Sequence, residues 1–212
     1  MENLNLLLFI SFAAPLLTAV ILCKNETRIF LSFLFIGMVV CLFTGEVNAL
    51  LMNVSQISFE YFTSNYSPLI EEFFKAIPIL IFAFIYKPEK KVLLESSILL
   101  GVGFAILENA FVIGYNAEYI SISMALIRGF GAGIMHSLCS YAVGYGMTYV
   151  HINRKLFYTG TIALLSVATI YHSIYNTVVQ SINYIYGFFL PVITLLLILL
   201  ITKIIRTKKS QD

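Results

Sequence analysis

The stretch Ile29–Met52, IFLSFLFIGMVVCLFTGEVNALLM, decides the fold, because Glu46 is the only charged residue in it. A helix that crosses the hydrocarbon core of a bilayer needs about 20 mostly apolar residues. The stretch meets this requirement of length and composition. We therefore expect it to form a membrane-spanning helix.

Six further stretches have the same character, so we expect about seven spans. They are Leu4–Cys23, Pro68–Tyr86, Ile98–Tyr115, Met124–Val150, Tyr158–Ser181 and Ile185–Thr202. No positive charge precedes the first stretch, which favours a retained span over a signal peptide. The apolar residues do not alternate in blocks of about ten, which disfavours a β-barrel. The predicted fold is an all-α, polytopic bundle of transmembrane helices, a single integral membrane domain over residues 1–212.

The composition excludes other classes of protein. Of the 212 residues, 59% are hydrophobic and 11% are charged, whereas an ordinary soluble domain has about 25% charged residues. A soluble or disordered chain is therefore excluded, and a net charge of +2 is too small for a nucleic-acid partner. The three cysteines lack paired spacing, so we expect neither a disulfide framework nor a thiolate metal site. The expected location is the cell membrane, with the lipid bilayer around a multi-pass protein.

The basic residues between the spans indicate the orientation. Eleven of the thirteen lie in alternate connections or in the tail: Lys24, Arg28, Lys87, Lys90, Lys91, Arg154, Lys155, Lys203, Arg206, Lys208 and Lys209. The intervening connections, Asn53–Ser67, Asn116–Ser123 and Ile182–Tyr184, contain no Lys or Arg. By the positive-inside rule, the N-terminus lies outside and the C-terminus inside, which requires an odd number of spans.

The other two basic residues, Lys75 and Arg128, fall inside predicted spans together with several polar side chains. These are Glu71, Glu72, Glu108, His136, His172 and Asn176. A charge at the bilayer centre costs at least about 2.5–3.5 kcal/mol, so each is a candidate for function. At about 1.5 Å of rise per residue, these side chains lie roughly 6 to 18 Å below the outer surface. We therefore expect one polar cavity that opens to the extracytoplasmic side.

The residue types in this cavity suit hydrolysis. Glu71 and Lys75 are four residues apart on a helix, so we expect them to pair, with Glu72 turned about 100° away. A glutamate near a Lys or Arg can act as a general base toward water. Histidine and asparagine can donate hydrogen bonds to the oxyanion of a tetrahedral intermediate.

Three other interpretations stay open. Histidine and glutamate from several helices are plausible zinc ligands, although no HExxH motif is present. Buried glutamate and histidine also relay ions in proton-coupled transporters, although the inner halves of the spans hold few ionisable residues. A third interpretation is a catalytically silent relative that only binds a partner.

Four short motifs, in order along residues 68–180, resemble those of the PrsW family of intramembrane proteases. Glu71-Glu72-Phe-Phe-Lys75 resembles the EExxK motif of that family, and Gly103-Phe104-Ala105-Ile-Leu-Glu108-Asn109 resembles its GFAxxEN motif. His136-Ser-Leu-Cys-Ser and His172-Ser-Ile-Tyr-Asn176 resemble its third and fourth motifs. Glu108 and the spacing of Lys75 favour this family over the related CAAX prenyl endopeptidases and CPBP proteins.

The resemblance implies a glutamic-type endopeptidase that needs neither a metal nor another cofactor. It implies a membrane-anchored protein as substrate, with an anti-sigma factor as the example that the family offers. Glu71 and Glu72 would activate water, and His136 and Glu108 would complete the catalytic set. His172 and Asn176 would orient water or stabilise the oxyanion, while Lys75, Asn109 and Arg128 would give electrostatic support. The resemblance does not decide which glutamate is the base.

Overall fold

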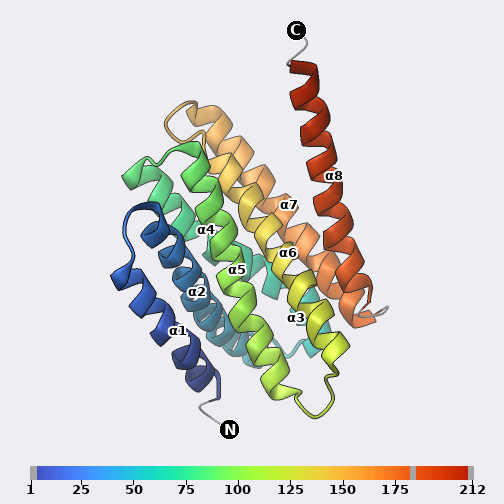
Figure 1. The fold of residues 1–212 in the computed structure, drawn as a ribbon. Helices are drawn as coiled ribbons and strands as arrows, with labels where there is room; N and C mark the ends of the chain where they lie inside the picture. Colours follow the sequence, from blue (N-terminus) through green and yellow to red (C-terminus); the bar gives the residue numbers. More distant parts are fainter. Residues whose placement is uncertain (1–3, 182–184, 210–212) are drawn as a thin grey trace.

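The computed structural model describes residues 4–181 and 185–209, and these residues form helices with no strand. This confirms the all-α fold. The elements, in chain order, are α1 (Leu4–Leu22), α2 (Asn25–Ser55), α3 (Phe59–Asn65), α4 (Ser67–Ile81), η1 (Phe82–Tyr86), α5 (Lys90–Tyr115), α6 (Ile122–Met147), α7 (Arg154–Ser181) and α8 (Tyr186–Lys209). Figure 1 shows the long helices side by side in a bundle, with α8 extending past the others at the C-terminal end.

Six of the helices are long and apolar enough to cross a membrane. They are α1, α2, α5, α6, α7 and α8, and each contains most of one predicted span. The remaining predicted span, Pro68–Tyr86, is α4 followed without a break by the π-helical segment η1. It differs from the six because α4 is short, with Pro78 and several charged residues within it.

The predicted connection Asn53–Ser67 contains an unexpected short helix, α3. Its Phe62 is buried and stacks on Tyr66, with the ring centroids 5.7 Å apart. The helix packs against α4 and α7. Sequence periodicity could not have indicated it, since the helix has only seven residues and part of its packing comes from α7, which is distant in the chain.

The connections alternate between the two ends of the bundle (Figure 1). The α1–α2, η1–α5 and α6–α7 connections lie at the end where α8 finishes, and these are the connections that carry the basic residues. The N-terminus, α3 and the α5–α6 connection lie at the opposite end. The arrangement agrees with the alternation in the sequence, while the assignment of cytoplasmic and extracytoplasmic sides stays a prediction.

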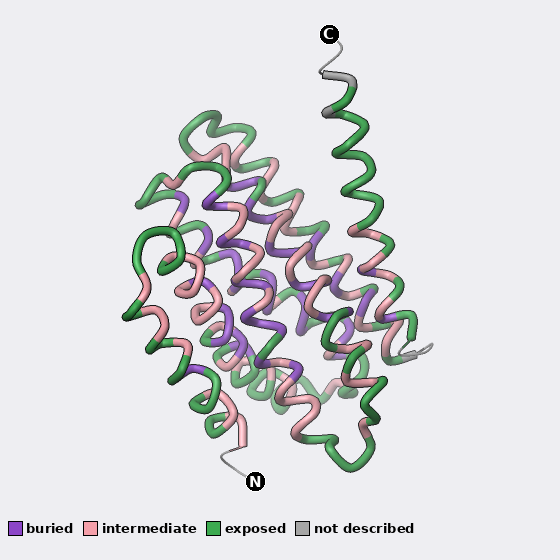
Figure 2. The backbone as a smooth tube through the Cα atoms, in the orientation of Figure 1, coloured by how far each residue is buried: buried purple, intermediate pink, exposed green. Residues whose placement is uncertain are grey.

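The centre of the bundle is formed where α5 packs against both α2 and α6, and the buried residues concentrate there (Figure 2). Glycines allow this close packing, as is usual for membrane helices. A Cβ added to Gly101 would lie 2.5 Å from the carbonyl oxygen of His136, and one on Gly103 would overlap the backbone of Leu34. By contrast, no neighbouring helix in the described part of the chain comes within 4 Å of such a Cβ at Gly129 or Gly133, so close packing does not explain these two glycines.

We predict that Gly101→Ala separates α5 from α6 and lowers the free energy of unfolding by about 1–3 kcal/mol, as overpacked cores do. Gly133→Ala is the matched control, because it adds the same methyl group to open space. Thermal unfolding in detergent would measure both variants. Equal melting temperatures for Gly101→Ala and the unsubstituted protein would contradict this account of the helix contact.

Candidate active site

Helix α4 places its charged side chains inside the bundle and several of its large apolar side chains outside. Glu72 and Lys75 are each 1% exposed, whereas Leu69 and Phe73 are about half exposed, at 54% and 52%. This is the reverse of a helix on the surface of a soluble protein, where large apolar side chains face the core. The pattern fits a helix whose outer face meets lipid and whose inner face forms a polar site.

Lys75 links α4 to α6. Its ammonium nitrogen lies 2.6 Å from Glu72 Oε1 and 3.0 Å from His136 Nδ1. It also lies 4.5 Å from the centre of the Phe104 ring, a cation–π distance. The predicted pairing of Lys75 with Glu71 is therefore wrong: the partner is Glu72, because the ammonium group points toward His136 while Glu71 points toward other donors.

The network continues from α6 to α5. His136 Nε2 lies 3.0 Å from Glu108 Oε2, which also lies 3.4 Å from Arg128 Nη2. His136 is fully buried, whereas the side chains of Glu108 and Arg128 are 26% and 22% exposed. The pair thus lies at the margin of the site, and its charges compensate one another across α5 and α6.

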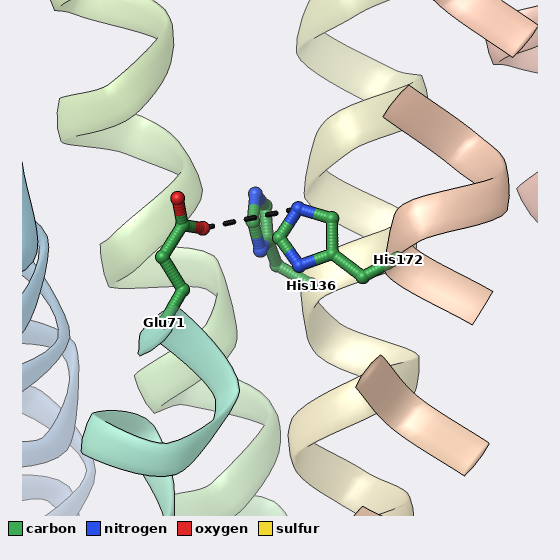
Figure 3. Close-up of side chains that lie close together, drawn as sticks. All are labelled: Glu71, His136 and His172. Carbon is green, nitrogen blue, oxygen red and sulfur yellow. Dashed lines mark ion pairs between the residues drawn. The ribbon is translucent and has the colours of Figure 1, made fainter. Parts of the chain in front are cut away.

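His172 of α7 faces both glutamates of α4. Its Nδ1 lies 2.8 Å from Glu72 Oε1, and its Nε2 lies 3.8 Å from Glu71 Oε2. Figure 3 shows Glu71 and His172 pointing toward one another, with His136 beside them. The two imidazole rings are 4.8 Å apart in an edge-to-face arrangement.

The structure therefore brings seven of the predicted site residues into one cluster from four helices. They are Glu71, Glu72 and Lys75 of α4, Glu108 of α5, Arg128 and His136 of α6, and His172 of α7. The catalytic roles of these residues stay predictions, since contact alone does not assign a role.

The two predicted asparagines lie apart from this network. The Asn176 side-chain nitrogen donates to the carbonyl oxygen of Thr63 at 2.9 Å, which ties α7 to α3. Asn109 is buried, and its side-chain oxygen has no hydrogen-bond partner among residues 4–181 and 185–209. Neither amide makes a hydrogen bond to a carboxylate or imidazole of the cluster within that part of the chain.

Two residues that the sequence analysis missed hold Glu71. Ser67 Oγ donates to Glu71 Oε1 at 2.5 Å, and Asn48 Nδ2 lies 2.7 Å from Ser67 Oγ and 3.4 Å from Glu71 Oε1. Ser67 could have been found, because it precedes Glu71 by one helical turn. Asn48 carried no such signal, since it reaches the site from α2 through tertiary packing.

The cluster also contains a possible ligand set for a metal ion. One ligand atom each of Glu71, His136 and His172 lies within 4.8 Å of the others. Two histidines and a glutamate form the ligand set of several catalytic zinc sites. Such histidines usually bond a carboxylate through their second nitrogen, as His172 does with Glu72 and His136 with Glu108.

Glu71 Oε2 and His172 Nε2 are buried without a hydrogen-bond partner in the described part of the chain, which leaves both available as ligands. His136 is less available, because both of its ring nitrogens already have partners. The cluster thus fits a metal in residue type and spacing, and the ammonium group of Lys75 is the one opposing feature.

Comparison with known proteins identifies the family. A sequence model described as PrsW family intramembrane metalloprotease matches residues 25–202, a range that includes the entire cluster. No curated protein and no solved structure matches the chain. The resemblance of the four motifs is therefore confirmed, and the six apolar helices agree with a multi-pass membrane protein. The chain belongs to the PrsW family of intramembrane proteases and is a membrane-embedded peptidase.

Proposed function

We propose that this peptidase hydrolyses a peptide bond of a membrane-anchored protein with a water molecule activated by Glu71. The observation that carries the proposal is the facing pair of Glu71 Oε2 and His172 Nε2, 3.8 Å apart and buried. Both atoms lack a partner in residues 4–181 and 185–209. A water molecule between them would be within hydrogen-bond reach of both.

The surrounding contacts favour Glu71 over Glu72 as the general base. Glu72 Oε1 interacts with Lys75 and His172, so Glu72 serves as a fixed partner for two neighbours. Its Oε2 is also buried without a partner in the described residues, but only Glu71 Oε2 faces a second unpartnered atom, His172 Nε2. Glu71 uses only its other oxygen, Oε1, to accept from Ser67 and Asn48. Its Oε2 is thereby held in place and left unoccupied by protein groups. We assign Ser67 and Asn48 as positioning residues for Glu71.

His172 orients the water molecule. If its Nδ1–H donates to Glu72, the neutral ring has an acceptor at Nε2, on the side of Glu71. Two acceptors then take the two hydrogens of the water and direct a lone pair toward the substrate carbonyl. We assign the positive charge of Lys75, which interacts with the same Glu72 oxygen as His172, to stabilising the oxyanion that forms, the role usual for preorganised charge in such sites.

A metal-dependent reaction is the second candidate, because the description of the family names a metalloprotease and the ligand set fits. Glu71, His136 and His172 would hold the ion, which would polarise a bound water. Glu72 and Glu108 would orient the two histidines from behind. In this case His136 would have to lose its contact with Lys75 in order to bind the ion.

We place the reaction near the extracytoplasmic side and propose an anti-sigma factor as one substrate. The position rests on α4, which begins at the end of the bundle opposite the basic connections (Figure 1). Glu71 follows the first residue of α4 by about one turn. The positive-inside rule makes that end extracytoplasmic. The proposal of an anti-sigma factor as substrate rests on the resemblance to the PrsW family. An ion-coupled transporter is not favoured, since the family is one of peptidases.

The first prediction concerns the base. We expect Glu71→Gln to reduce cleavage of a single-span substrate by the purified protein about 10²–10⁴-fold, because the amide cannot take a proton from water. Glu46→Gln on α2 makes the same change at an exposed position and should leave the rate unchanged. The assay is product formation in detergent or liposomes. Full activity of Glu71→Gln would refute the proposed mechanism.

The second prediction concerns the support of Glu71. Asn48→Ala removes one hydrogen bond to Ser67 and one to Glu71, so we expect kcat to fall about five- to tenfold, equivalent to about 1–1.5 kcal/mol. KM and the melting temperature should not change. Asn65→Ala is the control, because Asn65 is an exposed amide whose side-chain nitrogen donates to the carbonyl oxygen of Tyr61, outside the cluster. A change confined to stability would show that Asn48 does not position Glu71.

The third prediction separates the two candidate mechanisms. The glutamate mechanism predicts that the purified protein keeps its cleavage rate after treatment with EDTA and gel filtration. Loss of activity that returns on addition of Zn²⁺ would support the metal-dependent reaction instead. Elemental analysis of the protein before and after treatment provides the control, because it shows whether any ion was removed.

A further inference from the structure

A cavity of about 290 Å³ lies beside the active site, between the last turns of α5, the first turns of α6 and the last turns of α7. Figure 1 shows these helix ends at the end of the bundle where the N-terminus lies. Its walls are mostly apolar, and Val112, Met124, Ala125, Arg128, Tyr175 and Val179 are among the residues that line them. No residue of the proposed water-activating pair belongs to this lining.

The cavity adjoins the catalytic cluster on each of its three helices. Val112 follows Glu108 by four residues on α5, and Tyr175 follows His172 by three on α7. On α6, Arg128 belongs to both features: it lines the cavity and lies 3.4 Å from Glu108. A substrate chain that reaches Glu71 therefore has this cavity next to it.

Arg128 has hydrogen-bonding capacity to spare. A guanidinium group has five N–H donors, and the contact of Arg128 with Glu108 uses one nitrogen, Nη2. Its Nε is buried without an acceptor in residues 4–181 and 185–209. A peptide carbonyl placed at the inner end of the cavity would supply such an acceptor.

We propose that this cavity binds an apolar side chain of the substrate, at a residue close to the bond that is cut, while Arg128 donates to a backbone carbonyl beside it. The proposal rests on the proposed function, because it assumes that cleavage takes place at the Glu71–His172 pair. The apolar walls select the type of side chain. The volume, at the small end of the range for ligand pockets, suits a side chain and not a helix.

The test varies both the substrate and the pocket. In a single-span substrate, the three residues on either side of the cut are replaced one at a time by Ala, Leu and Phe, and kcat/KM is measured. We expect the unsubstituted protease to prefer Leu or Phe over Ala at one of these positions by at least about tenfold, the usual scale for a hydrophobic pocket. Ala125→Phe fills the cavity and should abolish or reverse that preference at that position alone.

The matched control is Ala142→Phe, which adds the same ring to α6 at a partly buried position that does not line the cavity. It should leave the preference as it is. Ala125→Leu is a milder variant, scored by the same ratio if Ala125→Phe does not fold. Because the readout is a ratio between substrates, a general loss of activity does not imitate the expected result.

The outcomes distinguish the two proposals. Substrate preferences that Ala125→Phe and Ala125→Leu leave unchanged would overturn the pocket assignment even if Glu71→Gln is inactive. Full activity of Glu71→Gln would refute the assignment of Glu71 as the general base. The substrate preference of the unsubstituted protease would still test the pocket. A shift produced equally by Ala142→Phe would also overturn the assignment.

Discussion

The buried ammonium group of Lys75 constrains the rest of the structure. Its residue is 1% exposed, and an unpaired charge at that depth would cost many kcal/mol. The compensation comes from Glu72 on the same helix, and from His136 and the ring of Phe104 on α6 and α5. Helix α4 therefore has to lie at one height and one rotation against those two helices. The close approach of α5 and α6 at Gly101 places His136 where that height requires it.

The same constraint creates the difference between the two neighbouring glutamates. Lys75 and His172 interact with Glu72, whereas Ser67 and Asn48 hold Glu71 through hydrogen bonds to its Oε1. Two carboxylates adjacent in sequence thus have different surroundings because a helix turns by about 100° per residue. Glu72 is neutralised by Lys75 and acts as a support, whereas the unpartnered oxygen of Glu71 faces the unpartnered Nε2 of His172. The chemistry that we propose depends on this division.

Much of the fold and the site could be predicted because charged side chains are rare in membrane-spanning stretches, so the few that occur there are easy to recognise. Glu108 and His136 stood out within apolar stretches, and the structure joins them at 3.0 Å. Contacts set by side-chain direction could not be predicted: helical spacing alone favoured Lys75 with Glu71, and the partner is Glu72. Asn48 is an ordinary amide in an apolar stretch until tertiary packing brings it to Glu71. The spacing of residues along one helix shows which of them share a face. It does not show which side chains a neighbouring helix places against that face.

Helix α4, which carries three of the seven residues of the cluster, does not qualify as a membrane span on its own. It has a charged inner face, a proline and a short length. It packs against α2, α5, α6 and α7, so those apolar helices supply the partners for its polar face. Its exposed apolar face, with Leu69 and Phe73, is suited to contact with lipid. Because the stability of α4 depends on the surrounding bundle, the free carboxylate oxygen of Glu71 can be kept in a buried position that an isolated helix would not tolerate.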